Sequence, residues 1–199
     1  MRNIIILIGC LLAFSFFARA NDGKKIYQNK CATCHDSTSE SMTTPFLHGQ
    51  EKRFLIQAIN DFRIDKRTDH IMNSMNNIAK TLTEKEIEDV TAYLAAHDPC
   101  VVQSTLNPRE SGWIEKFREG QRLVTEKNCL HCHGSFHHAA PRLYGQKKSY
   151  LDKSIELFRE DKRPGFFKMI DIAKSLSDDE IDKMTHYLNG MILMRDCHI

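Results

Sequence analysis

The sequence has no marked excess of basic residues, which a nucleic-acid-binding domain typically carries. Its 199 residues include 28 Lys and Arg against 26 Asp and Glu. Tryptophan is scarce, with Trp113 alone, and aromatic residues make up 9% of the chain. With 41% hydrophobic and 27% charged residues, the composition is typical of a folded soluble protein. We therefore expect a globular protein that does not bind nucleic acid.

Long hydrophobic runs are absent except at the N-terminus. Residues 4–17 are almost entirely apolar, follow Arg2, and are too few for a membrane span of about 20 residues. Ala18-Arg19-Ala20 then has the A-x-A form of a cleavage site. We predict a signal peptide over residues 1–20 and an exported chain that begins at Asn21. Membrane association should be peripheral at most.

Two alternatives remain for this N-terminal segment. It could stay uncleaved as an anchor helix. Leu7-Ile8-Gly9-Cys10 also resembles a bacterial lipobox. The apolar region before Cys10 would then have about five residues, fewer than the usual ~7–15 of an export signal.

Sustained strand alternation is also absent, and the chain instead repeats itself after about 95 residues. The matched segments are Gly23–Tyr27 with Gly120–Val124, Cys31–His35 with Cys129–His133, Pro45–Gln50 with Pro141–Gln146, Phe62–Arg67 with Phe158–Arg163, and Leu82–Leu94 with Leu176–Leu188. The repeat predicts two tandem copies of one small domain, over residues 21–104 and 105–199, with a linker near Asp98–Pro108.

Each copy has the hydrophobic pattern of helices, so we predict an all-α fold. The predicted apolar stripes are Leu55, Ile59 and Phe62 with Leu151, Ile155 and Phe158, and then Ile87, Val90 and Leu94 with Ile181, Met184 and Leu188. Thr83-x-x-Glu86 and Ser177-x-x-Glu180 are capping boxes that open the last helix of each copy. Domains this small have thin cores, so we expect a further group to complete each one.

A Cys-x-x-Cys-His motif in each copy predicts that group to be a covalently attached c-type haem. The first motif contains Cys31, Cys34 and His35. The second contains Cys129, Cys132 and His133. In such a motif the two thiols attach to the vinyl groups of one porphyrin, and the adjacent histidine turns back to bind the iron. The sequence therefore predicts two haems.

Other uses of paired cysteines fit the sequence less well. A thioredoxin-like redox motif would lie in a βαβ unit. A zinc ribbon places its two Cys-x-x-Cys pairs about 15–20 residues apart, whereas these motifs are about 100 apart. A disulfide framework would leave the two histidines unexplained.

Methionines are the predicted ligands on the other face of each iron. Met75 lies seven residues before Leu82, and Met169 lies seven residues before Leu176. Met72 fails this test, because its counterpart is Phe166. A thioether opposite histidine raises the reduction potential and suits an electron carrier. His48 and His70 are alternative ligands in the first copy.

Two further pairs of residues recur in phase and could support the haems. An iron-bound histidine usually donates its other N–H to a carbonyl or carboxylate, and Pro45 and Pro141 could present such a carbonyl. Arg67 and Arg163 could pair with haem propionates through their guanidinium groups. A solvated charge at a helix end is an equal alternative for both arginines.

On these motifs, the sequence resembles the class I cytochromes c, and specifically the two-domain cytochrome c4 group. The resemblance covers residues 21–199. It implies two class I cytochrome folds with closely spaced haem edges and no catalytic residues. It also implies a periplasmic carrier, which accepts electrons from a quinol-oxidising complex and passes them towards a terminal haem–copper oxidase.

Several features lie outside the matched pattern. Cys100 and Cys197 recur at the ends of the two copies and could form a disulfide if their Cα atoms lie within about 7 Å. Intermolecular pairing or unpaired thiols are the alternatives. His137 and His138 occupy a loop of the second copy, either as a solvated pair or as a regulatory metal site.

The sequence leaves three functional hypotheses open. The leading one is an electron carrier, a monomer or weak oligomer, whose redox partners dock transiently over less than about 1,200 Å². The second is a dihaem enzyme of the peroxidase or thiosulfate dehydrogenase type. The third is a bound cytochrome subunit of a respiratory complex.

Overall fold

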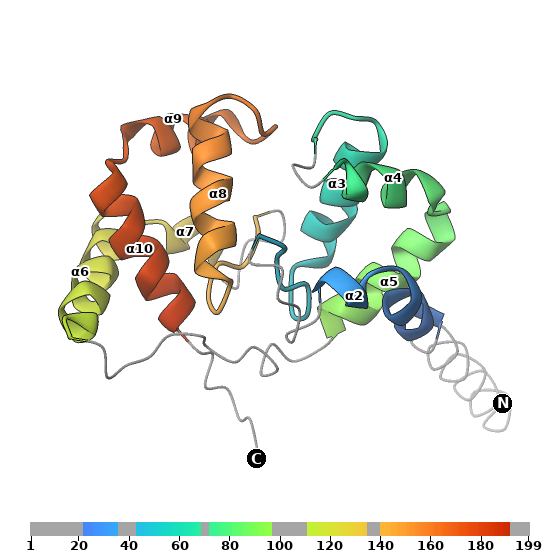
Figure 1. The fold of residues 1–199 in the computed structure, drawn as a ribbon, viewed down its shortest axis with the longest axis horizontal. Coiled ribbons are helices and arrows are strands. Elements are labelled where there is room, and N and C mark those ends of the chain that lie inside the picture. Colours follow the sequence, from blue (N-terminus) through green and yellow to red (C-terminus); the bar gives the residue numbers. More distant parts are fainter. Residues whose placement is uncertain (1–21, 36–42, 69–71, 97–110, 135–139, 192–199) are drawn as a thin grey trace, which may run out of the picture.

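The computed structural model describes residues 22–35, 43–68, 72–96, 111–134 and 140–191. Over these ranges the chain is helical and has no strand, which confirms the predicted all-α class. Figure 1 shows two sets of helices, one from each half of the chain, side by side along the longest axis. The predicted signal peptide and the boundary between residues 104 and 105 lie outside the described ranges.

The two halves contain the same helices in the same order. In the first half, residues 22–30 are helical and are followed by α2 (Ala32–His35), α3 (Lys52–Arg63), α4 (Ser74–Thr81) and α5 (Glu84–Ala96). In the second half the elements are α6 (Trp113–Glu126), α7 (Leu130–His133), α8 (Lys148–Arg159), α9 (Phe167–Ser175) and α10 (Asp178–Gly190). The sequence repeat therefore corresponds to a structural repeat.

The first and last helices of each half pack closely at a glycine. A Cβ atom added to Gly120 of α6 would lie 2.1 Å from the carbonyl oxygen of Lys183 in α10. A Cβ atom at Gly23 would lie 2.3 Å from the carbonyl oxygen of Asp89 in α5. Both distances are shorter than van der Waals contact, so only glycine permits this approach. This explains why glycine recurs at both positions.

The last helix of each half supplies the predicted buried stripe. Ile87, Val90 and Leu94 are buried in α5, and so are the three predicted residues of α10. The prediction for α8 needs a correction. Leu151 and Leu157 are buried there, whereas Ile155 and Phe158 are half-buried. The guanidinium carbon of Arg163 lies 4.8 Å from the centroid of the Phe158 ring.

Both predicted capping boxes are present. The Ser177 hydroxyl accepts a hydrogen bond from the amide of Glu180, whose carboxylate accepts one from the amide of Ser177. Thr83 and Glu86 make the same pair of bonds. Each glutamate also binds a lysine near the end of the first helix, Glu86 with Lys30 at 2.7 Å and Glu180 with Lys127 at 2.8 Å. These bonds to lysine and to the cap lower the pKa of both carboxylates to about 2.

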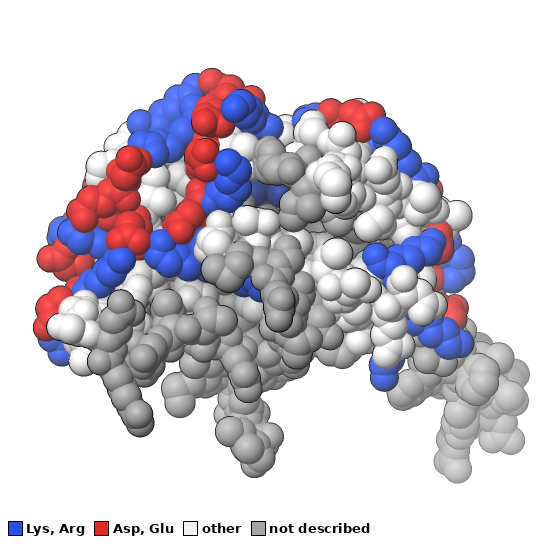
Figure 2. All heavy atoms as spheres, viewed as in Figure 1, with Lys and Arg blue, Asp and Glu red and all other residues white. Residues whose placement is uncertain are grey.

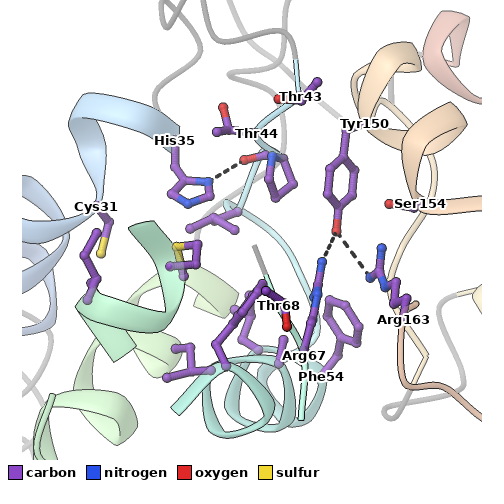
Figure 3. Close-up of a pocket in the computed structure, with 18 of the residues that line it drawn as sticks. Cys31, His35, Thr43, Thr44, Phe54, Arg67, Thr68, Tyr150, Ser154 and Arg163 are labelled. Atoms are coloured by element: carbon purple, nitrogen blue, oxygen red, sulfur yellow. Dashed lines mark hydrogen bonds between the residues drawn. The ribbon is translucent and has the colours of Figure 1, made fainter. Parts of the chain in front are cut away.

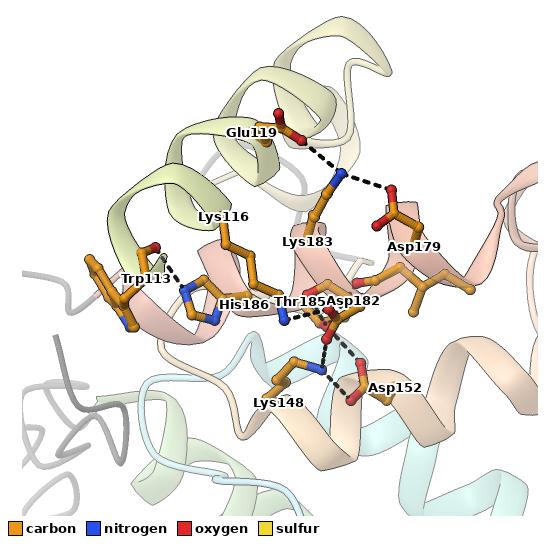
Figure 4. A network of polar contacts seen from close by, with 11 residues as sticks. Trp113, Lys116, Glu119, Lys148, Asp152, Asp179, Asp182, Lys183, Thr185 and His186 are labelled. Carbon is orange, nitrogen blue, oxygen red and sulfur yellow. Dashed lines mark hydrogen bonds and ion pairs between the residues drawn. The ribbon is translucent and has the colours of Figure 1, made fainter. Parts of the chain in front are cut away.

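Ion pairs also join α6 and α8 to α10 in the second half (Figure 4). Asp182 of α10 pairs with Lys116 of α6 and with Lys148 of α8. Lys183 pairs with Glu119 of α6 at 2.7 Å. On the face drawn in Figure 2, basic and acidic side chains alternate over this half, so no large patch of one sign forms there.

Replacing Gly120 by alanine should destabilise the protein. The added Cβ would push α6 away from α10, and overpacking of this kind typically costs about 1–3 kcal/mol. Chemical denaturation would measure the loss. Gln121→Ala is the matched control, because Gln121 is exposed on the same helix and should tolerate alanine. Equal stability of both variants would contradict the close packing.

Candidate haem sites

The two Cys-x-x-Cys-His motifs form equivalent helical turns. The amide of His35 donates to the carbonyl of Cys31 at 3.0 Å, and the amide of His133 donates to the carbonyl of Cys129 at 3.1 Å. This turn places each histidine directly after its cysteine pair. Burial raises the pKa of the Cys31 thiol to about 11, whereas Cys34 is exposed. None of the four cysteines in these turns forms a disulfide.

Each histidine ring is fixed by a proline carbonyl. His35 Nδ1 lies 2.8 Å from the Pro45 oxygen, and His133 Nδ1 lies 2.8 Å from the Pro141 oxygen. Because a carbonyl oxygen can only accept, Nδ1 carries the proton and donates it. Nε2 then keeps the lone pair that a metal ion requires. Both rings are thus held in the tautomer that binds iron.

A cavity of about 180 Å³ lies next to this histidine in the first half (Figure 3). Cys31, His35 and Met75 all line it. Much of the remaining wall comes from apolar side chains of the segment from α3 to α5, namely Leu55, Ile59, Phe62, Ile78, Leu82 and Val90. A thiol, an oriented imidazole and a thioether around an apolar space are the groups that hold a c-type haem, so the residues fit that cofactor.

The two candidate methionines of the first half have different surroundings. Met75, in α4, is half-buried and lines the cavity. Met72 is 87% exposed and precedes α4. Of the two, Met75 is therefore the thioether placed to face a haem, and its role as the sixth ligand remains a prediction.

The second half repeats this arrangement in part. His133 is held by Pro141, and burial lowers the pKa of its imidazole. Met169 is half-buried in α9, which packs against α8. Cys129 packs against the core of this half, whereas Cys132 is exposed. Met169 remains the predicted sixth ligand.

The two predicted propionate-binding arginines meet at a single cavity. Arg67 and Arg163, from different halves of the chain, both line the cavity beside His35. Each donates to the Tyr150 hydroxyl, Arg67 at 3.4 Å and Arg163 at 3.3 Å (Figure 3). Arg163 is only 6% exposed, which contradicts a solvated helix-end charge at that position. Arg163 belongs to the second half of the chain yet lines the cavity beside His35 in the first.

Two glutamines join the halves through matching hydrogen bonds. Gln146 accepts from the amide of Phe46 at 2.8 Å and donates to the carbonyl of Phe46 at 3.0 Å. Gln50 accepts from the amide of Arg142 at 2.5 Å and donates to its carbonyl at 2.9 Å. Phe46 and Arg142 directly follow the prolines that hold the histidines. The loops that orient the two rings therefore also form the domain interface.

Sequence reasoning missed three of these residues. Gln50 and Gln146 recur in phase at the end of the proline loop, and that recurrence was an available signal. Tyr150 gave no such signal, because the residue at the same position of α3 is Phe54. Only the packing of the two halves brings Tyr150 to the cavity of the first.

Most of the alternative residues fall in parts of the chain that the structure does not describe. His70, Cys100, His137, His138 and Cys197 lie outside the described ranges, as does the lipobox-like segment.

His48 lies within the described ranges. Its ring packs edge-on against Tyr27, with 4.6 Å between centroids, and it does not line the cavity. In the described ranges no three His, Cys, Asp or Glu residues form a metal-binding cluster.

Comparisons with known proteins agree with this geometry. The chain matches the cytochrome c family twice, over residues 20–98 and 117–191. Cytochrome c4 of Pseudomonas aeruginosa is 29% identical over 204 residues, with 96% of this chain and all of that protein aligned. The thiosulfate dehydrogenase electron acceptor of Stutzerimonas stutzeri is 30% identical over 196 residues, covering 88% of this chain and 89% of that protein.

Among solved structures, cytochrome c4 of Acidithiobacillus ferrooxidans superimposes with a TM-score of 0.65 at 26% identity. The superposition covers 80% of this chain and 97% of that one. The likeness therefore includes both halves and not a single domain.

Replacing Gln146 by alanine should weaken the domain interface. The amide and carbonyl of Phe46 would lose their partners, and a buried polar group left unpaired costs about 1–3 kcal/mol. Hydrogen exchange at the Phe46 amide should accelerate. Gln57→Ala is the control, because Gln57 bonds only Asp61 in its own helix, at 2.8 Å. Unchanged exchange at Phe46 in Gln146→Ala would contradict the role of this bond.

Proposed function

This chain belongs to the cytochrome c family and is a dihaem protein of the cytochrome c4 type, and from that premise we propose that it carries electrons in the periplasm. The proposed donor is a quinol-oxidising complex, and the proposed acceptor is a terminal haem–copper oxidase. One observation supports the carrier role above the others. Cys31, His35 and Met75 line one largely apolar cavity, so an imidazole and a thioether would both be available there to hold a haem iron.

Each residue around this cavity has a distinct task. The cysteines would attach the haem, whose iron, when bound, changes between the ferric and ferrous states. His35 would hold the iron through Nε2 while Nδ1 donates to Pro45. Met75 would occupy the remaining axial position, where a thioether favours the reduced state. With both positions filled, a reactant has no place to bind, so the site transfers electrons without transforming a substrate.

A second electron donor is favoured by one of the relatives. The relative from Stutzerimonas stutzeri is named as an electron acceptor of thiosulfate dehydrogenase. By analogy, this chain could accept electrons from such an enzyme and still be a carrier. Stopped-flow mixing of the oxidised protein with each donor would decide between them, since the physiological donor should reduce both haems faster than the other.

The proposed periplasmic location rests on the signal peptide predicted over residues 1–20. Among the described residues, no helix is long and apolar enough to cross a membrane. Recovery of the protein in a periplasmic wash would support a diffusing carrier. Retention in washed membranes would favour the bound subunit of a respiratory complex.

Removing either of the two methionines should leave one haem iron without its sixth ligand and leave the other haem unchanged. Met75→Ala and Met169→Ala are each expected to lower one of the two reduction potentials, because the thioether that favours ferrous iron is lost. The opened haem should become high-spin and bind carbon monoxide when reduced. Redox titration and optical spectra would measure both effects.

Met72→Ala is the matched control, because Met72 is exposed and lies outside the cavity wall. Both potentials should remain unchanged in that variant. If Met75→Ala behaved like this control, Met75 would not be a ligand and the carrier proposal would fail. Carbon monoxide binding by the unaltered protein would instead favour a dihaem enzyme.

A further inference from the structure

The Tyr150 hydroxyl lies where the two halves meet. Tyr150 belongs to α8 of the second half, yet it lines the cavity that contains His35. Its oxygen accepts hydrogen bonds from Arg67 and Arg163, one arginine from each half (Figure 3). The equivalent residue in α3 is Phe54, which has no hydroxyl, so only the second repeat supplies a hydroxyl at this position.

The two arginines bring positive charge that no acidic residue of the described ranges balances. Among the described residues, no carboxylate lies within ion-pair distance of Arg67 or Arg163, and none lines the cavity. Each guanidinium instead lies over a phenylalanine ring, Arg67 over Phe62 at 4.4 Å and Arg163 over Phe158 at 4.8 Å. Arg163 is buried and Arg67 is half-buried, and positive charge withdrawn from water in this way is stabilised by an anion nearby.

The other ionisable groups of the cavity do not supply that anion. Three lysines also line it, and each is paired with a glutamate, Lys30 with Glu86, Lys153 with Glu156 and Lys162 with Glu160. Cys31 and His35 are committed to the haem. Among the described residues that line the cavity, Tyr150 is thus the remaining group that can become negative.

We propose that the Tyr150 hydroxyl is a proton-binding site shared by the two haem domains, which takes up a proton when the first domain's haem is reduced. In the oxidised protein above pH 7, Tyr150 would be a phenolate between the two guanidinium groups. One electron then enters from the redox partner and one proton enters from water, and the only bond formed is the O–H bond of Tyr150.

Electrostatics supports this assignment. Burial by itself would raise the pKa of Tyr150, but the charges and hydrogen bonds of Arg163 and Arg67 outweigh it and bring the pKa to about 7. An added electron in the same cavity opposes the phenolate and raises this pKa. Reduction and protonation are then linked over the interval between the two pKa values.

The pH dependence of each reduction potential in the complete dihaem protein tests the proposal. Above pH 7, the equilibrium constant for reducing the first haem should fall by up to about tenfold per pH unit, because one proton accompanies the electron. This dependence should vanish in Tyr150→Phe. The potential that shifts in Met75→Ala identifies the first haem.

A hydroxyl-deletion control is available in the first half, which contains the cavity beside His35. Tyr93→Phe removes a hydroxyl whose pKa is raised by burial, so the pH dependence should persist. Arg163→Gln should move the onset of the dependence to higher pH, because the phenolate loses one of its two cations. A pH dependence that persists in Tyr150→Phe would assign the proton to another group, such as a haem carboxylate, and overturn the proposal.

NMR of the unaltered protein gives a readout that needs no variant. With isotope-labelled tyrosine, one tyrosine should titrate near pH 7 in the oxidised protein and at higher pH in the reduced protein. Absence of a neutral-pH tyrosine titration would also overturn the proposal. The inference rests on electron transfer by two haems, and its failure leaves both redox couples intact, whereas failure of the carrier function would abolish a reversible couple.

Discussion

The arrangement of both haem sites depends on one hydrogen bond that the chain makes twice, from histidine Nδ1 to a proline carbonyl at 2.8 Å. This bond fixes the tautomer and the ring orientation, so that Nε2 is the atom offered to iron. In the first half it directs the imidazole towards a cavity that Met75 also lines. The protein fold itself therefore brings the candidate ligands of that site together and orients the histidine.

The same proline loops also hold the two domains together. The residue after each proline forms main-chain hydrogen bonds with a glutamine of the other half. Phe46 bonds to the Gln146 side chain, and Arg142 bonds to the Gln50 side chain. A movement of one domain would therefore pull on the loop that positions the histidine of the other. Arg163 and Tyr150 extend this dependence, because the second half supplies them to the cavity of the first. The two centres are chemically similar but do not have identical surroundings.

Much of this could be predicted from the sequence, because the chain contains two copies of each local pattern. Spacing and periodicity were sufficient for the capping boxes, the last-helix stripes and the order of helices. They were insufficient for Tyr150, since its partners come from both domains and no local pattern encodes how the domains pack. The same holds for Arg163. Its recurrence with Arg67 indicated that the position matters, but it did not indicate that Arg163 would line the cavity of the other domain. Phe158 continues the apolar stripe of α8 but is only half-buried, because helical periodicity locates a stripe without fixing how fully each of its residues is covered.

The central proposal is that one histidine and one methionine would bind each haem iron. Magnetic circular dichroism of the fully oxidised protein in the near infrared tests it directly, through the charge-transfer band that a thioether gives with ferric iron. The account predicts two low-spin centres per chain, each contributing such a band at equal intensity. A band from only one centre, a bis-histidine spectrum or a high-spin ferric signal would contradict it.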